Sequence, residues 1–353
     1  MKIIRLCTLL NFGGLEQRLV NISHINDGHE WIFCALGTGG EAAEEITKNG
    51  KRVVLLDVAY TIPSVKAIQK LVSFFLQEKP DVVHTSGAEA NFHGIIAAKM
   101  TGVKRLIAEE IGIPNQKIHH KIMVKIIYKF PDYVLANSKP VTNYLEKENG
   151  VNPKILKIIP NPLNAIAKRA IQQSYSKDFQ ILTISRLKVV KNIEGILKVI
   201  ALLVQENHPL KFTVIGDGDN FLALKERASD LGIAENVEFK GFIPSPLSGI
   251  KETNLFILNS FTEGFSNALV EAMSAGIPCL ATDVGAAGDL IEENETGWLV
   301  KPGDEQDLYI KMKFILSLEK ERLAEVGNNG RNAVIGKYHL NRHISQLMEA
   351  YQK

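Results

Sequence analysis

Residues 180–192 of this 353-residue chain read QILTISRLKVVKN, an apolar run followed by a loop with several positive charges. The run from Gln180 to Ile184 has the length of a buried strand, and amphipathic segments alternate with further apolar runs after it. Such alternation is typical of parallel strands joined by crossover helices. The stretch therefore predicts the first strand of an α/β domain.

The same alternation also fills the first half of the chain. Seven runs there read as strands: Ile3–Leu9, Trp31–Ala35, Val53–Leu56, Val82–His84, Leu106–Ala108, Tyr133–Ala136 and Ile155–Ile159. Five more follow the opening stretch: Lys211–Ile215, Val237–Phe239, Leu255–Leu258, Pro278–Ala281 and Trp298–Val300. A proline-rich and polar break between Pro153 and Asp178 separates the two series. Two tandem Rossmann-like domains with a ligand cleft between them are the simplest account.

The length and the end of the chain complete this domain plan. A chain of 353 residues exceeds what one hydrophobic core usually supports. We predict an N-terminal domain over residues 1–165 and a C-terminal domain over residues 166–335. From residue 304 the sequence reads as consecutive helices, and we expect residues 336–353 to pack back on the N-terminal domain.

The composition is that of a globular protein, with 45% hydrophobic and 23% charged residues, which excludes the disordered class. No apolar run approaches the roughly 20 residues of a membrane-spanning helix, and Arg5 interrupts the apolar N-terminus. The three cysteines, Cys7, Cys34 and Cys279, are far apart, which favours neither a disulfide framework nor a zinc site. We therefore expect a cytoplasmic protein.

The charge is unevenly distributed. Residues 1–170 hold 22 Lys and Arg against 15 Asp and Glu, whereas the rest holds 19 against 24. A basic half suits phosphate groups, nucleic acid or an anionic membrane, and the count alone does not choose among them.

Loops that follow strands are the places to look for a ligand site, because ligands of open α/β sheets bind beyond the carboxyl ends of the strands. After the first strand, Gly13 and Gly14 would let backbone N–H groups approach an anion, although a tight turn is the alternative. In the opening stretch, the positive charges of Arg186 and Lys191 suit a diphosphate. The alternative is that the two side chains are a solvated pair on the surface.

A third loop contains Gly216 and Gly218, followed by Asp219. It does not complete a dinucleotide fingerprint, because Phe221 stands where the third glycine belongs, which argues against an NAD-linked oxidoreductase. We expect these glycines to form a close turn near a nucleotide. No second set of hard-metal ligands accompanies the aspartates, so no catalytic metal is expected.

The fourth loop, TEGFSNALVEAM at residues 262–273, holds two glutamates eight positions apart. Eight helical residues make about 2.2 turns and a rise of roughly 12 Å, so the two carboxylates should hold different groups. We place Glu263 before a helix, Ser266 and Asn267 at its N-terminus and Glu271 within it. A diphosphate could then cap the helix. Alternatively, Glu271 is an ordinary exposed glutamate.

Together, Glu263-x7-Glu271 with Gly264-Phe265, Arg186 and Lys191 closely resembles the family-4 group of retaining glycosyltransferases of the GT-B fold. Further family markers occur in order along nearly the whole chain: Gly13-Gly14-x-Glu16, Gly28-His29-Glu30, Val83-His84, Asn137-Ser138, Ile159-Pro160-Asn161, Gly216-Asp217-Gly218 and Glu271-Ala272-Met273-x-x-Gly276-x-Pro278.

The resemblance implies a hexosyltransferase that uses a nucleotide-diphosphate sugar and needs no metal or other cofactor. It puts Arg186 and Lys191 at the diphosphate, Glu263 at the sugar and Glu271 at the ribose. The acceptor, a glycan or a lipid-linked glycan, would face the N-terminal domain, and bacterial surface polysaccharide assembly would be the setting. No nucleic acid partner is implied. The remaining residues predicted to bind the donor are Gly13, Gly14, Gly216, Gly218, Gly264, Phe265, Ser266 and Asn267.

The sequence departs from the family pattern at two places. Many relatives carry a histidine after the strand Leu106–Ala108, where this chain has Glu110. We expect Glu110 to take that catalytic position, with His84 as a second candidate. Asp289 stands where a glutamate is usual in the loop that begins at Gly285. Two alternatives stay open. One is another nucleotide-sugar enzyme of this fold, such as an epimerase or synthase, and the other, suggested by the missing histidine, is a non-catalytic nucleotide-sugar binder.

One segment of the first half suggests a membrane contact. Lys117, Lys121, Lys125 and Lys129 recur every four residues between apolar positions. A basic amphipathic helix of this kind can lie on an anionic membrane and bring the enzyme to a lipid-linked acceptor. A core-packed helix with a solvated lysine face is the alternative, and the sequence alone favours it.

Overall fold

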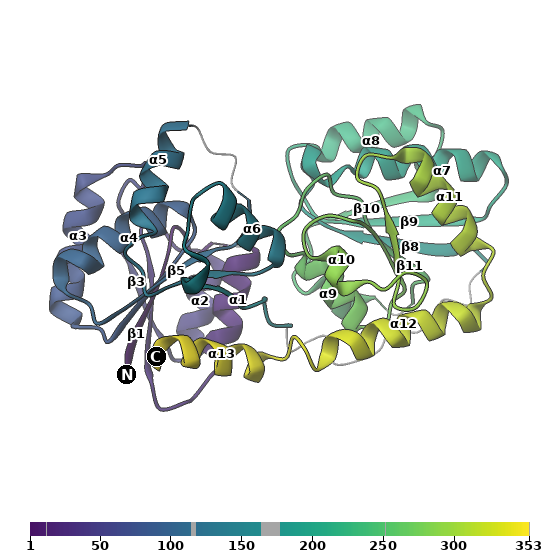
Figure 1. Ribbon diagram of the computed structural model, residues 1–353. Helices are drawn as coiled ribbons and strands as arrows, with labels where there is room; N and C mark the ends of the chain where they lie inside the picture. Colours follow the sequence, from purple (N-terminus) through teal and green to yellow (C-terminus); the bar gives the residue numbers. More distant parts are fainter. Residues whose placement is uncertain (12, 114–117, 164–176, 251, 353) are drawn as a thin grey trace. The chain divides into compact units, whose positions relative to one another are not determined.

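The computed structural model describes residues 1–11, 13–113, 118–163, 177–250 and 252–352. The chain divides into two compact units (Figure 1), the first formed by Met1–Pro162 with Leu340–Lys353 and the second by Leu163–His339. The predicted domain limits at residues 165 and 335 lie within about four residues of these divisions.

The first unit is built on a parallel sheet in the order β3-β2-β1-β4-β5-β6-β7. All pairings in it are parallel. Each strand falls on a predicted apolar run: β1 Lys2–Cys7, β2 Glu30–Ala35, β3 Arg52–Leu55, β4 Val82–Ser86, β5 Arg105–Glu110, β6 Tyr133–Ala136 and β7 Leu156–Ile158.

Helices cover both faces of this sheet. They are α1 Gly14–Ser23, α2 Glu41–Lys48, α3 Val65–Glu78, α4 Ala88–Thr101, α5 Ile118–Ile127, α6 Lys139–Lys147 and α13 Leu340–Gln352. One apolar layer joins α3, α4, α5 and α6 to the sheet, and the other joins α1, α2 and the C-terminal helix α13. Because both faces are covered, the central strands are mostly apolar rather than alternating, with buried polar exceptions such as Arg5 in β1 and His84 in β4.

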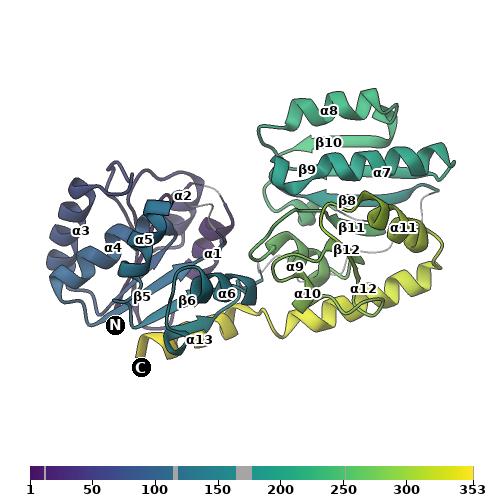
Figure 2. The ribbon, with the colours of Figure 1, turned by 45° about the horizontal axis from the view of Figure 1, so that its top comes forward.

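The second unit repeats this plan with the sheet order β10-β9-β8-β11-β12-β13 (Figure 2). Its strands are β8 Phe179–Ile184, β9 Leu210–Ile215, β10 Val237–Gly241, β11 Leu255–Leu258, β12 Cys279–Thr282 and β13 Trp298–Val300. Its helices are α7 Ile193–Gln205, α8 Phe221–Asp230, α9 Asn267–Ser274, α10 Ala287–Leu290, α11 Glu305–Leu316 and α12 Lys320–Ile335. The predicted α/β architecture of two Rossmann-like halves with a C-terminal helix is confirmed.

Local sequence explains where several helices begin. The Asn192 side chain accepts a hydrogen bond from the Gly195 N–H at the start of α7, and Asp304 caps α11 through the Asp307 N–H. All three cysteines are free and buried. Within the described part of the chain, no helix has the length and apolar character needed to cross a membrane.

Candidate active site

The loop after β8 carries the two cations predicted to bind a diphosphate. Arg186 is exposed, two residues beyond the end of the strand. Lys191 ends a short 3-10 turn, Val189–Lys191, and its side chain is 20% exposed. Its ammonium forms a salt bridge with Oε1 of Glu263, which belongs to the loop after β11. Two of the predicted donor residues, 72 positions apart, are therefore in direct contact.

A third residue holds the same carboxylate. The Ser260 hydroxyl donates to Oε1 of Glu263 at 2.9 Å, and Ser260 has no exposed surface. Glu263 itself keeps 11% of its side chain exposed. The site therefore presents a carboxylate with one oxygen fixed by two donors at the carboxyl edge of the second sheet.

The two glycines after β9 are required by a close backbone approach. Gly216 has a φ of 139°, and a Cβ at this position would lie 1.8 Å from the Ser185 carbonyl oxygen. A Cβ at Gly218 would lie 2.6 Å from the Leu187 carbonyl oxygen. The two loops thus pack backbone against backbone on either side of Arg186. This is the predicted close turn, and a nucleotide contact for it stays a prediction.

The segment with the two glutamates folds as predicted. Ser266 precedes α9 and its side chain accepts a hydrogen bond from the Leu269 N–H, while Asn267 is the first helical residue. Glu271 is half-buried in the second turn, and burial raises the pKa of its carboxyl to about 7. Glu271 is therefore not an ordinary exposed glutamate, which was the alternative interpretation of this residue.

The backbone around Gly264 packs closely against the next loop. Gly285 has a φ of 59°, and a Cβ there would lie 2.7 Å from the Gly264 carbonyl oxygen and 2.6 Å from that of Glu263. The Phe265 ring packs against Tyr338, with ring centroids 5.6 Å apart. Phe265 thereby supports the residues after α12, and a contact with the donor stays a prediction.

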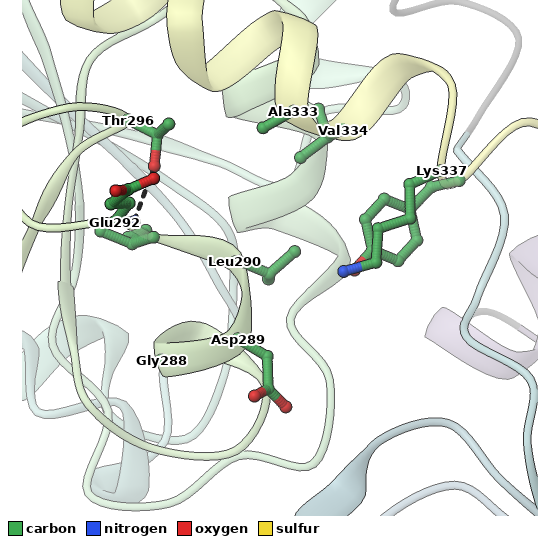
Figure 3. A pocket seen from close by; sticks show the side chains of 10 residues that line it. Gly288, Asp289, Leu290, Glu292, Thr296, Ala333, Val334 and Lys337 are labelled. Atoms are coloured by element: carbon green, nitrogen blue, oxygen red, sulfur yellow. Dashed lines mark hydrogen bonds between the residues drawn. The ribbon is translucent and has the colours of Figure 1, made fainter.

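The second unit also contains a hollow of about 410 Å³ between α10 and α12 (Figure 3). It is lined by Gly288, Asp289, Leu290, Ile291, Glu292, Thr296, Ala333, Val334, Lys337 and Tyr338. Among its lining residues, the Glu292 N–H donates a hydrogen bond to the Thr296 hydroxyl at 2.8 Å. None of the residues predicted to bind the donor lines it, but Tyr338 of its lining packs against Phe265.

In the first unit, Gly13 precedes α1 and Gly14 is its first residue. A Cβ on Gly13 would lie 2.4 Å from a carboxylate oxygen of Glu16. Because the neighbour is the end of a flexible side chain, it can move away. The phosphate role of this glycine pair stays a prediction.

Glu110 is the last residue of β5 and is 3% exposed. The Asn91 side-chain amide donates to it at 3.4 Å, and the Tyr128 hydroxyl also bonds its carboxyl. Burial, together with the nearby carboxylate of Glu89, raises the pKa of Glu110 to about 8. At neutral pH this carboxyl is therefore mostly protonated. Its role beside a sugar stays a prediction.

The neighbouring carboxyl, Glu109, points to the other face of the sheet and lies in a buried polar network that the sequence did not reveal. Arg18 from α1 forms a bidentate pair with it, at 2.6 Å for both bonds. Arg5 from β1 lies 3.4 Å away. Burial alone would raise the pKa of Glu109, but the Arg18 charge and its neighbours hold the pKa well below its usual range.

The alternative candidate His84 belongs to this network. It has no exposed surface, and its Nδ1 lies 2.7 Å from the Tyr351 hydroxyl of α13. Burial and the Arg5 charge lower the pKa of His84 to about 3, so the imidazole is neutral. His84 therefore ties the sheet to the C-terminal helix. The signal for the network was Arg5, a charged residue in the middle of an apolar strand.

Two family models together match residues 12–333 of the chain. The model described as Glycosyltransferase Family 4 matches residues 12–165, and the model described as Glycosyl transferases group 1 matches residues 164–333. The two matches divide the chain close to the boundary between its two units.

Individual relatives and solved structures agree with this match. The GalNAc-alpha-(1->4)-GalNAc-alpha-(1->3)-diNAcBac-PP-undecaprenol alpha-1,4-N-acetyl-D-galactosaminyltransferase of Campylobacter jejuni is 28% identical over 342 residues, 93% of this chain and 92% of the relative. The capsular polysaccharide biosynthesis glycosyltransferase CapM of Staphylococcus aureus is 26% identical and covers 83% of this chain and 85% of its own length.

The structure of Anabaena HepE in complex with UDP superposes with a TM-score of 0.87 at 20% identity and covers 100% of both chains. This structural similarity shows the fold, whereas the evidence for the activity comes from the family models and the related enzymes. The chain therefore belongs to the group 1 glycosyltransferases of the GT-B fold and is a glycosyltransferase.

Proposed function

We propose that this protein is a retaining glycosyltransferase that moves a hexose-type sugar from a uridine-diphosphate donor to a lipid-linked or other glycan acceptor during bacterial surface polysaccharide synthesis. The observation that carries the proposal is the Lys191–Glu263 ion pair beside Arg186 at the carboxyl edge of the second sheet. This arrangement joins cations for a leaving diphosphate to a hydrogen-bond acceptor for a sugar.

Each group has a role in the proposed reaction. Arg186 and Lys191 neutralise the charge that develops on the departing diphosphate, so the reaction needs no metal. The N-terminus of α9, capped by Ser266, adds backbone N–H groups for the same anion. The Glu263 carboxylate accepts a hydrogen bond from a hydroxyl of the donor sugar, and the Glu271 carboxylate accepts hydrogen bonds from the ribose hydroxyls.

The relatives guide the choice of substrates. HepE has been captured with UDP, and the Campylobacter enzyme acts on a glycan carried by undecaprenol diphosphate. Uridine-diphosphate sugars and polyprenyl-diphosphate glycans are therefore the first donors and acceptors to examine. Capsule synthesis, the setting of CapM, supports the polysaccharide assignment.

The direct test is transfer of radiolabel from a panel of uridine-diphosphate hexoses and N-acetylhexosamines to polyprenyl-diphosphate glycans, with EDTA in a parallel reaction. We expect transfer in both reactions and a product with the anomeric configuration of the donor, read by proton NMR. Donor conversion without transfer would indicate an epimerase or synthase instead. Binding without any turnover would indicate a nucleotide-sugar binder.

The raised pKa of Glu271 gives the donor affinity a pH dependence. Only the ionised Glu271 carboxylate accepts hydrogen bonds from two ribose hydroxyls. At pH 6 this carboxyl is protonated in most molecules of the free protein. We expect the Kd for a uridine-diphosphate sugar to rise about tenfold from pH 8 to pH 6. Isothermal titration calorimetry measures this, and the diphosphate diester of the intact donor does not itself titrate in that range.

Glu271→Gln is the matched variant, because it keeps the shape of the side chain and removes the titrating group. We expect weaker binding that no longer changes between pH 6 and pH 8. A wild-type Kd that is flat over this range would contradict the assignment of Glu271 to the ribose.

We also propose that the first unit docks on the cytoplasmic face of an anionic membrane. Near the end of α5, Ile126 is 54% and Phe130 is 45% exposed, and Met100 at the end of α4 is 67% exposed.

Lysines lie beside these exposed apolar side chains. Lys125 and Lys129 are exposed, and the Lys99 ammonium lies 5.8 Å from the Phe130 ring centroid. The side chains of Lys117 and Lys121 lie outside the described residues. Exposed apolar groups ringed by lysines suit a lipid headgroup boundary.

Sedimentation with vesicles tests this contact. We expect the protein to bind phosphatidylglycerol vesicles and not phosphatidylcholine vesicles. Each lysine near an anionic surface contributes about 1 kcal/mol, so Lys125→Gln with Lys129→Gln should weaken binding roughly 30-fold. The control is Lys48→Gln with Lys66→Gln, two exposed lysines on α2 and α3. Equal losses in both double variants would contradict a contact through this face.

A further inference from the structure

Ser260 is buried beside the carboxylate that we assign to the donor sugar. It lies two residues beyond β11 and has no exposed surface. Its hydroxyl donates to Oε1 of Glu263 at 2.9 Å. A buried hydroxyl that bonds a carboxylate in a ligand site restricts where that carboxylate can point.

The other donor to Oε1 is Lys191, which has a second task in the proposed reaction. An ammonium attracts a diphosphate, with its two negative charges, more strongly than it attracts one carboxylate at a similar distance. When the donor binds, Lys191 is therefore drawn toward the diphosphate. Glu263 then depends on its remaining hydrogen-bond donor to stay in place.

The backbone around Ser260 is held by groups other than the Lys191 side chain. The Ser260 carbonyl oxygen accepts from the hydroxyl of Thr282, a fully buried residue at the end of β12, at 2.8 Å. The next N–H, that of Phe261, donates to the Val190 carbonyl oxygen at 2.8 Å. The end of β12 and the backbone of the loop after β8 thus hold the chain at Ser260, and its hydroxyl keeps its place when the Lys191 side chain moves.

We propose that Ser260 is a positioning residue for Glu263. It holds Oε1 once Lys191 has turned to the diphosphate, so that the other carboxylate oxygen faces a hydroxyl of the donor sugar. The inference rests on the proposed function and concerns the sugar part of the donor alone. Ser260 therefore contributes to binding of the sugar and not to binding of the nucleotide.

Ser260→Ala separates these two contributions. We expect calorimetry to give a Kd for UDP within about twofold of wild type and a Kd for uridine-diphosphate galactose, or whichever donor proves active, raised about tenfold, which is the usual effect of losing a hydrogen bond to a charged group. In a Glu263→Gln background, where the carboxylate is gone, the same substitution should add little further loss.

Ser274→Ala is the matched control, because Ser274 is equally buried and its hydroxyl donates to a backbone carbonyl, that of Glu271. We expect it to leave both affinities unchanged. An unchanged donor Kd in Ser260→Ala would overturn the inference, and so would an equal loss for UDP and the donor, which would assign Ser260 to the nucleotide loop. If wild-type protein binds no nucleotide at all, the proposed function itself fails.

Discussion

Replacing Lys191 with alanine is expected to lower kcat/KM for sugar transfer about 10²–10³-fold, the usual cost of removing one preorganised group that stabilises charge in the transition state. The ammonium lies at the carboxyl edge of the second sheet, already ordered by Glu263 before a ligand arrives. Its removal takes a positive charge from the leaving diphosphate, whereas Ser260 still holds the Glu263 carboxylate. The loss should therefore appear mainly in kcat.

The control for this variant is Lys188→Ala in the same loop. Lys188 is exposed and is not among the residues predicted to bind the donor. Steady-state transfer kinetics, with thermal melting to confirm folding, should show near-normal activity for Lys188→Ala. Arg186→Ala and Glu263→Ala should also abolish most transfer. Activity within threefold of wild type in Lys191→Ala would remove the diphosphate assignment.

Replacing Glu109 with alanine is expected to destabilise the first unit by about 3–5 kcal/mol, because it leaves two buried guanidinium groups without their counter-charge. Arg5 is 1% and Arg18 is 2% exposed, so neither can reach water without opening the unit. The network also joins the sheet to the C-terminal helix through Tyr351. We therefore expect the contact between the sheet and α13 to weaken together with the loss of stability.

The adjacent carboxyl supplies the control. Glu110→Gln resembles the protonated form that the raised pKa already favours at neutral pH, so we expect a change below about 1 kcal/mol. Urea unfolding can be followed by Trp31 fluorescence in a Trp298→Phe background, since the chain has one tryptophan in each unit. Equal midpoints for the Glu109→Ala and Glu110→Gln variants would contradict a structural role for the network.

The strand pattern was readable from the sequence because these strands are buried on both faces. Runs such as Tyr133–Ala136 and Leu255–Leu258 match their strands residue for residue. The ends of β4 and β5 were less predictable. Each strand extends into polar residues, Ser86 and Glu109–Glu110, that the apolar pattern excluded. Arg5 donates to Ser86, Arg18 to Glu109 and Asn91 to Glu110, and such tertiary partners are invisible in a local window.

The order of residues around α9 was also predictable from local chemistry. A glycine that breaks the chain, a serine that caps a helix and a glutamate in the second turn are short-range features. The pairing of Glu263 with Lys191 was not predictable in this way, because it needs β8 and β11 to be neighbours in the sheet.

The sequence by itself determined two α/β halves, the loops that follow their strands, and the positions of Arg186, Lys191, Glu263 and Glu271 in those loops. Only the tertiary structure decided what the side chains bond. Glu109 and Glu110 are adjacent in the chain, yet one is ionised between arginines and the other is mostly protonated beside Tyr128. The reason is that successive residues of a strand point to opposite faces of the sheet, and different helices cover those faces.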